Sequence, residues 1–109
     1  MTSGTSGYPG AWGTSSTDIY AVGHKILHYD GTNWSAMSDE TYRNLRAVWG
    51  TSSTDVYAVG DYGEILHYDG ISWSAMTSAT TAQLYALWGA SSGDFFAVGG
   101  HGVILRGSR

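Results

Sequence analysis

The chain has 109 residues, one domain at most, and its lack of cysteine excludes both a disulfide framework and a thiolate metal site. Its 16 glycines, 14% aromatic residues and only 13% charged residues favour short strands and tight turns over helices. A net charge of −4 with five Lys and Arg residues argues against a nucleic-acid partner, and no apolar run is long enough to span a membrane.

The chain begins with a small polar segment, residues 1–7 (MTSGTSG), which we interpret as a flexible N-terminal segment without a role. Residues 8–109 then form a single repeat domain, with repeats at about 8–44, 45–83 and 84–109. The three repeats share the stretches WGTSSTDIYAVG, WGTSSTDVYAVG and WGASSGDFFAVG, which begin at Trp12, Trp49 and Trp88. A period between 20 and 50 residues is typical of propellers and solenoids.

Each repeat is expected to form four antiparallel strands. In the second repeat these are residues 45–49, 56–59, 64–68 and 73–76, separated by a polar TSSTD turn and by an Asp-Gly turn signal. Pro9 removes one backbone donor, so the first strand of the first repeat should be weak or lie at an edge. The third repeat ends in RGSR without a counterpart of the fourth strand, which predicts two four-stranded blades and one three-stranded blade.

The second strand of each repeat is apolar on both faces. Val56 and Ala58 point to one face and Tyr57 and Val59 to the other, so both faces must be covered. A propeller blade between two neighbours meets this requirement, and about 40 residues in four strands is one blade's length. We therefore predict an all-β propeller arc in which Trp12, Trp49 and Trp88 pack between blades.

The repeat resembles bacterial tandem repeats of the form WGxSxxDVYAVGxxGxIxHYDGxxW, and it is similar in outline to kelch repeats through AVGG, YDG and a tryptophan in the last strand. It also resembles the Asp-box of sialidase-like propellers, although Asp30 to Trp34 and Asp69 to Trp73 are one residue closer than that motif requires. The resemblance covers residues 8–107. It implies a propeller fold and little about activity.

Three blades cannot close a ring, because propellers generally have four to eight. A homodimer would give a six-bladed ring and cover the two apolar faces that an arc leaves exposed. The alternative is that the sequence is a natural or engineered fragment of a longer propeller.

The two kinds of loop that differ most between repeats emerge on the same face of a propeller. They are the turn between the second and third strands and the connection to the next repeat. Loops on a rigid scaffold carry function, so this face is the candidate binding surface, although loops also vary when nothing constrains them. The candidate ligand-binding residues are Tyr42, Arg43, Asp61, Tyr62, Glu64 and His101.

Several polar residues recur and are expected to have structural roles. His28 and His67 could form part of a metal or sugar site, but Arg106 takes their place in the third repeat, so we expect each ring to pack beside a neighbour. The aspartates that precede the second and fourth strands are expected to cap turns through backbone N–H groups. These are Asp18, Asp55, Asp94, Asp30 and Asp69.

The predicted function is therefore a non-catalytic binding or scaffold module with no metal and no cofactor, since no catalytic, phosphate-binding or zinc-binding motif occurs. The expected partners are a second copy and a carbohydrate or protein ligand, with carbohydrate the first to test. The alternatives are a hydrolase or lyase with Asp61, Glu64 and His101 assembled across the oligomer, and an engineered or fragment propeller with no ligand.

Overall fold

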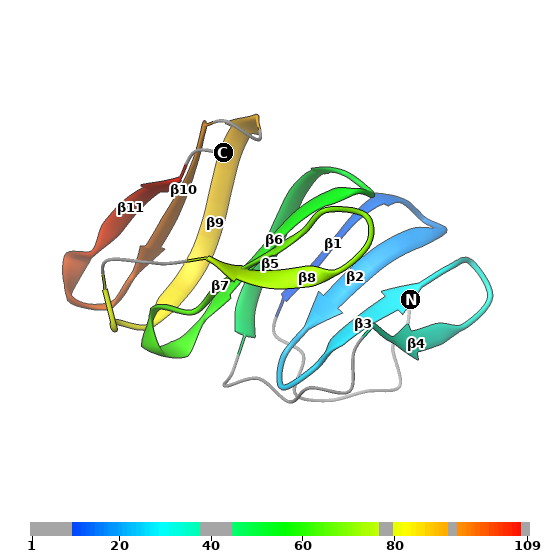
Figure 1. The fold of residues 1–109 in the computed structure, drawn as a ribbon, viewed down its shortest axis with the longest axis horizontal. Coiled ribbons are helices and arrows are strands. Elements are labelled where there is room, and N and C mark those ends of the chain that lie inside the picture. The colour runs from blue at the N-terminus through cyan, green and yellow to red at the C-terminus, as the bar shows by residue number, and fades with distance from the viewer. Residues whose placement is uncertain (1–9, 38–44, 77–79, 92–93, 108–109) are drawn as a thin grey trace.

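The computed structural model describes residues 10–37, 45–76, 80–91 and 94–107. This part of the chain is all-β and consists of three antiparallel sheets with four, four and three strands (Figure 1). Each sheet is formed by one continuous stretch of sequence, as the repeats predict. Within the described ranges no helix has the length and apolar character needed to cross a membrane.

The first sheet contains β1 (Gly10–Ser15), β2 (Asp18–Val22), β3 (Ile26–Tyr29) and β4 (Trp34–Ala36), paired in chain order. β1 is therefore an edge strand of its sheet, which confirms its predicted position. Pro9 and the segment 1–7 lie outside the described residues.

The second sheet contains β5 (Leu45–Ser52), β6 (Asp55–Gly60), β7 (Ile65–Tyr68) and β8 (Trp73–Met76). A short 3₁₀ turn, η1 (Asp61–Gly63), joins β6 to β7. The third sheet contains β9 (Leu84–Ser91), β10 (Asp94–Gly99) and β11 (Ile104–Gly107), with a matching 3₁₀ turn, η2 (Gly100–Gly102). The predicted four, four and three strands are confirmed within the described residues.

The first strand of the second sheet is longer than predicted. β5 continues through Gly50 to Ser52, which pairs with Asp55, so the turn is only residues 53–54. The sequence TSSTD was predicted to be entirely turn because Ser, Thr and Asp favour turns. A register shift between Gly50 and Ser52 lets the strand pairing continue into this polar stretch.

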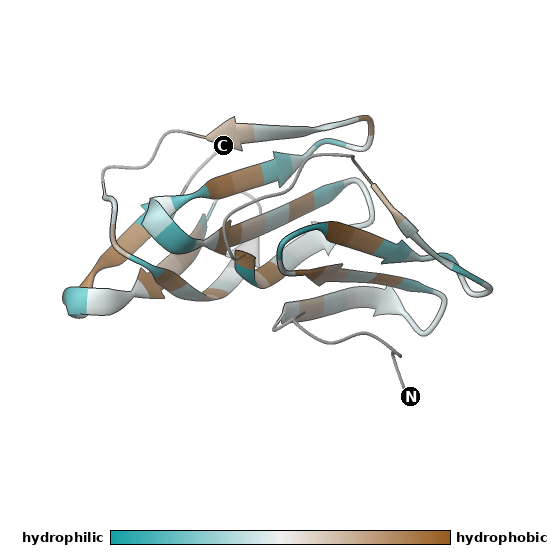
Figure 2. Cartoon of the chain, turned by 90° about the horizontal axis from the view of Figure 1, so that it is seen from below, coloured by the Kyte–Doolittle hydropathy of each residue, from teal (hydrophilic) through white to brown (hydrophobic). Residues whose placement is uncertain are grey.

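The sheets pack against one another in the order of the sequence, with hydrophobic segments concentrated in the strands (Figure 2). The face of the first sheet that carries Tyr20 and Val22 packs on the face of the second that carries Val56 and Ala58. The opposite face of the second sheet, with Val59, packs on the third sheet. The prediction that β6 is covered on both faces is confirmed, because every residue of β6 is buried.

A tryptophan from one sheet lies over a glycine of the next at both interfaces. A Cβ atom built on Gly50 would lie 3.1 Å from Cη2 of Trp12, and one built on Gly89 would lie 2.5 Å from Cη2 of Trp49. Only the absence of a side chain at these glycines leaves room for the indole rings. The predicted packing of Trp12 and Trp49 between sheets is therefore confirmed.

Trp88 has no such packing within the single chain, where it is 65% exposed. Trp88 occupies the equivalent position on β9, but none of the described elements packs on the face of the third sheet that carries it.

Polar contacts also join the first and second sheets. The Tyr20 hydroxyl donates to the carbonyl oxygen of Ser53 at 2.8 Å, and the Leu45 N–H donates to the carbonyl of Gly23 at 3.0 Å. Burial, together with the nearby Asp18 carboxylate and Tyr68, raises the pKa of Tyr20 to about 12. The neutral hydroxyl is therefore retained as a donor well above neutral pH.

Candidate binding surface

The antiparallel order of the strands brings the turns between the second and third strands of each sheet to one end of the sheets, here called the turn end (Figure 1). The turn end carries the β2–β3, β6–β7 and β10–β11 turns, together with the last residues of β4 and β8 and the first residues of β5 and β9. This is the face predicted to bind a ligand. Tyr42 and Arg43, two of the predicted residues, lie outside the described part of the chain.

The β6–β7 and β10–β11 turns have the same unusual backbone. Tyr62 has φ 60° and ψ 26°, and His101 has φ 59° and ψ 24°. Each is followed by a glycine that also has positive φ, Gly63 or Gly102. A non-glycine residue in this region is strained by about 1–2 kcal/mol. The two turns therefore hold an aromatic ring and an imidazole at equivalent positions of neighbouring sheets.

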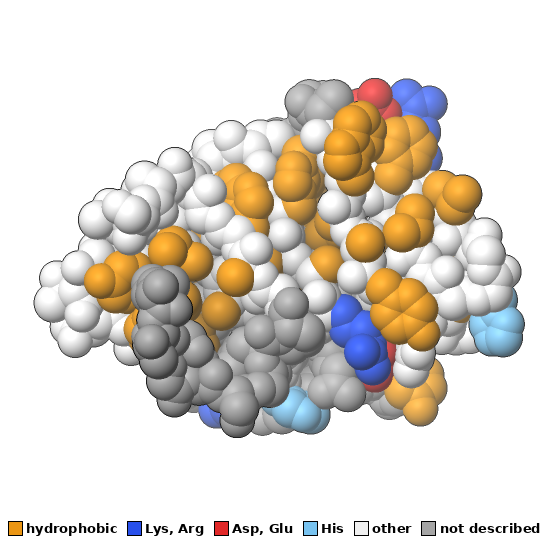
Figure 3. Space-filling model, turned by 180° about the vertical axis from the view of Figure 1, so that it is seen from behind, with side chains coloured by type: hydrophobic (Ala, Val, Ile, Leu, Met, Phe, Trp, Pro, Cys, Tyr) orange, Lys and Arg blue, Asp and Glu red, His pale blue; other side chains and the backbone are white. Residues whose placement is uncertain are grey.

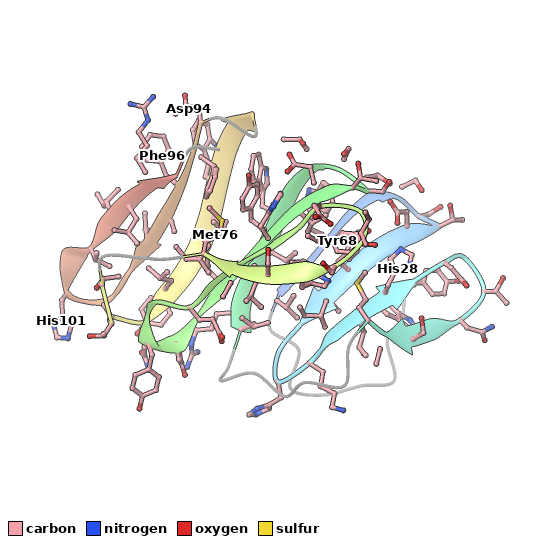
Figure 4. All side chains as sticks on the ribbon, viewed as in Figure 1. His28, Tyr68, Met76, Asp94, Phe96 and His101 are labelled. Carbon is pink, nitrogen blue, oxygen red and sulfur yellow. The ribbon has the colours of Figure 1, made fainter. Side chains whose placement is uncertain are left out.

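Tyr62 and His101 are both exposed, Tyr62 by 63%. His101 lies at the end of the third sheet opposite to Asp94 and Phe96 (Figure 4). Their exposure and position make them the two predicted residues best placed to contact a ligand.

Asp61 has a different environment, because it is only 7% exposed and is held by Arg46. Nε of Arg46 donates to Oδ1 of Asp61 at 2.6 Å, and Nη2 donates to Oδ2 at 3.4 Å. This hydrogen bond raises the pKa of Arg46 above its ordinary value. The carboxylate of Asp61 thus fixes the β6–β7 turn to β5.

The same arginine connects the turn to the third sheet. The Arg46 guanidinium carbon lies 5.5 Å from the centre of the Tyr85 ring, and the Tyr85 hydroxyl donates to Oε1 of Gln83 at 2.5 Å. Arg46 and Tyr85 were not among the predicted site residues, because they lie on β5 and β9 and no local sequence pattern relates either residue to the variable turn.

Glu64 closes the β6–β7 turn through its backbone. Its N–H donates to the Asp61 carbonyl at 3.2 Å, and its own carbonyl accepts from the Gly60 N–H at 3.0 Å. The structure therefore places Asp61, Tyr62 and Glu64 on one turn and His101 on the turn of the next sheet.

The recurrent aspartates that begin β2 and β6 bind a threonine and a histidine of their own sheet. Asp18 accepts from the Thr14 hydroxyl at 2.5 Å and lies 2.6 Å from Nε2 of His28. The hydroxyl of Thr51 donates to Asp55 in the same way, and Nε2 of His67 lies 2.7 Å from Asp55.

These side-chain partners of the two aspartates were not predicted. The missed signal was the joint recurrence of Asp with His in the first two repeats.

The histidine rings also pack beside the neighbouring tyrosines in tilted arrangements, as predicted. The ring centroids of Tyr20 and His28 are 4.8 Å apart, and those of Tyr57 and His67 are 4.5 Å apart. In the third sheet Nε of Arg106 donates to Asp94 at 3.1 Å, so a cationic side chain takes the place of the imidazole. In all three sheets the aspartate therefore has a side-chain partner on the next strand.

Burial tends to raise the pKa of Asp18, but the hydrogen bonds from Thr14 and His28 outweigh it and hold that pKa below the ordinary value. Asp30 and Asp69 were predicted to cap turns, and they do. Asp30 accepts from the backbone N–H groups of Asn33 and Thr32, which lower its pKa, and Asp69 accepts from the corresponding groups one repeat later.

Within the described ranges, no group of three or more His, Cys, Asp and Glu side chains could hold a metal ion. No protein-family model matches the chain, and no curated protein matches it. Any functional inference must therefore be made from the geometry of the molecule itself.

Proposed function

We propose that this protein is a non-catalytic binding and scaffold module built as a three-bladed arc of a β-propeller. The packing of the three sheets in chain order supports this architecture. The first strand of each sheet contacts the first strand of the next, β1 with β5 and β5 with β9, as expected for blades that radiate from a common axis. In this proposal two copies of the chain complete a six-bladed ring.

The ligand is proposed to bind at the turn end. The observation that carries this proposal is the matched pair of strained and exposed residues, Tyr62 and His101, on neighbouring turns. Backbone strain that persists in a protein is often associated with function, because selection for stability alone would favour glycine at such positions. A phenol and an imidazole suit a carbohydrate, whose ring packs on aromatic faces and whose hydroxyls accept and donate hydrogen bonds.

The role of Asp61 favours binding over acid–base catalysis. Its carboxylate is almost buried and is bonded to a guanidinium, which is an arrangement suited to holding a turn in place.

A glycan array tests the proposal. Wild-type protein should bind a defined set of glycans, and Tyr62→Gly and His101→Gly should each lose that binding while gaining up to about 1 kcal/mol in the free energy of unfolding. Ile71→Ala is the matched control, because Ile71 is 88% exposed on a different turn. Its substitution should leave binding unchanged.

Absence of binding above background would remove carbohydrate as the ligand. Binding that survives both glycine substitutions would remove the turn end as the site.

A further inference from the structure

One face of the third sheet is apolar and exposed, and it is here called the outer face. Its residues are Trp88, Phe96, Val98, Ile104 and Arg106. Trp88 is 65% exposed, Val98 39% and Ile104 68%. Hydrophobic side chains gather on the side of the molecule that β9–β11 form (Figure 3). Exposed apolar patches of this kind mark interaction sites.

The equivalent valines and isoleucines of the other two sheets are buried. Val22 and Val59, the counterparts of Val98, are both 0% exposed, and Ile26, a counterpart of Ile104, is also 0% exposed. They are covered because the next sheet along the chain packs on them. The outer face therefore presents a third copy of a surface that is used twice within the chain.

The complementary surface lies at the other end of the array, on the first sheet. A hollow of about 390 Å³ is lined by Ala11, Trp12, Gly13, Thr14, Ser15 and Ile19. Gly13 is the counterpart of Gly50 and Gly89, the two glycines that receive a tryptophan from the preceding sheet. The hollow is shallow and open to solvent, so the indole ring of a second molecule can reach it.

We propose that a second copy of this chain docks on the outer face, with Trp88 of one copy in the hollow over Gly13 of the other. This contact has the same arrangement as the two contacts within the chain, in which Trp12 packs on Gly50 and Trp49 packs on Gly89. It is a head-to-tail contact, because different surfaces of the two copies meet. The proposal rests on the propeller architecture proposed above and is independent of any ligand at the turn end.

One polar contact of the internal interfaces is missing from the proposed one. Tyr20 donates its hydroxyl to the carbonyl of Ser53, on the β5–β6 turn. The counterpart of Tyr20 on the outer face is Phe96, and the counterpart of Ser53 on the first sheet is Ser16. Phe96→Tyr should therefore supply a hydroxyl for the Ser16 carbonyl of the second copy and strengthen the contact.

Light scattering on a sizing column over a range of protein concentrations measures the association. The wild-type chain should be a dimer, and Trp88→Ala should raise the dimer dissociation constant by about thirtyfold or more, as expected for a central aromatic anchor. Ile71→Ala, which removes an apolar side chain that is 88% exposed on a turn of the middle sheet, should have no effect. Phe96→Tyr should lower the dissociation constant.

A second variant tests the hollow. Ala11 is exposed, so Ala11→Glu should leave the fold intact by circular dichroism but abolish the dimer, because it places a charge where the indole ring should lie. Thr32→Glu adds the same charge to an exposed turn of the same sheet and should leave the dimer unchanged.

Mixing the two defective variants distinguishes a head-to-tail contact from a symmetric one. Trp88→Ala protein keeps the hollow and Ala11→Glu protein keeps Trp88. The mixture should therefore associate through one intact interface at a concentration where each variant alone is monomeric. A symmetric contact between two outer faces would not be restored by mixing.

The proposal is overturned if the wild-type chain is monomeric at every concentration, or if either Trp88→Ala or Ala11→Glu leaves the dimer unchanged. Larger oligomers that both variants dissolve would support the Trp88 contact but overturn the six-bladed ring. Glycan binding by monomeric Ala11→Glu protein would show that the turn end functions without the dimer. A dimer that binds no glycan would support the contact and remove the proposed ligand.

Discussion

β6 and β10 have almost the same sequence, DVYAVG and DFFAVG, and yet they are buried differently. Every residue of β6 is buried, whereas in β10 Phe95 and Ala97 are buried and Val98 is 39% exposed. The difference comes from the neighbouring sheets, because β6 is covered on both faces and β10 on one. Equal residues therefore contribute unequally to stability, and matched substitutions at equivalent positions can measure by how much.

The largest difference in the free energy of unfolding is expected between the Ile26→Ala and Ile104→Ala variants. Ile26 is 0% exposed and Ile104 is 68% exposed at the equivalent position of β11. The first substitution should lower the free energy of unfolding by about 2–5 kcal/mol through lost burial and a residual cavity. The second should change it by less than about 0.5 kcal/mol. Denaturant unfolding at concentrations where the chain is monomeric measures both values, and equal losses would contradict the structural difference.

A smaller difference in the free energy of unfolding is expected between Gly89→Ala and Gly100→Ala. A Cβ at Gly89 would lie 2.5 Å from Cη2 of Trp49 and 2.7 Å from Cβ of Phe95, so Gly89→Ala should cost about 1–3 kcal/mol by overpacking the interface. A Cβ at Gly100 would have no neighbour closer than 3.8 Å, and Gly100→Ala should be neutral or slightly stabilising. Thermal unfolding should separate the two variants, and an unchanged melting temperature for Gly89→Ala would contradict the tight tryptophan contact.

The loss in the free energy of unfolding should also differ between Asp55→Ala and Asp94→Ala, by about as much as between the two glycine variants or by less. Asp55 is 6% exposed, and Asp55→Ala leaves Thr51 and His67 without this acceptor, so we expect a loss of about 1–3 kcal/mol. The side chains of Asp94 and Arg106 are 44% and 68% exposed, and removal of such an exposed pair should cost less than about 1 kcal/mol. Urea unfolding of both variants makes the comparison, and a costlier Asp94→Ala would show that burial does not set the strength of these pairs.

The smallest effect on stability is expected from Asp30 and Asp69, the two aspartates that cap turns. The backbone N–H groups of Asn33 and Thr32 lower the pKa of Asp30 below 3.8, and Asp69 is lowered in the same way one repeat later. A lowered pKa in the folded state means that the stabilisation is complete above the unfolded pKa and is lost as pH falls through the lower folded value. Stability should therefore decrease below about pH 4.

In the Asp30→Asn, Asp69→Asn double variant the free energy of unfolding should decrease less steeply as pH falls. Denaturant unfolding at a series of acidic pH values measures this dependence. An unchanged acid dependence would show that these two carboxylates do not contribute to it.

Most of the strand pattern could be predicted from the sequence, because it depends on local signals. The continuous apolar run in β6 predicts that both of its faces are covered, and Asp30 and Asp69 cap the chain where Asp-Gly predicts a turn. The length of β5 could not be predicted, since Ser52 joins the sheet only through its pairing with Asp55 after a register shift.

The candidate site was less predictable, because its contacts cross between strands and sheets. The sequence identifies the turn that contains Tyr62 but not its positive φ, and it does not relate Asp61 to Arg46 or Arg46 to Tyr85. The exposure of Trp88 could not be predicted from a motif that it shares with two tryptophans that pack between sheets. The contacts of Asp61 and Arg46 are made with residues from other strands. The exposure of Trp88 depends on the lack of a described element that packs on its face of the third sheet.

The complete burial of β6 also has a consequence for the order in which the molecule opens. If the first or the third sheet detaches transiently, the remaining one of the two still covers one face of β6. The pairing of β6 with β5 and β7 then persists. Local opening of this kind requires the least free energy at the ends of a stacked array and the most at its centre. The amide hydrogens of β6 should therefore exchange with solvent last, and those of β11 among the first.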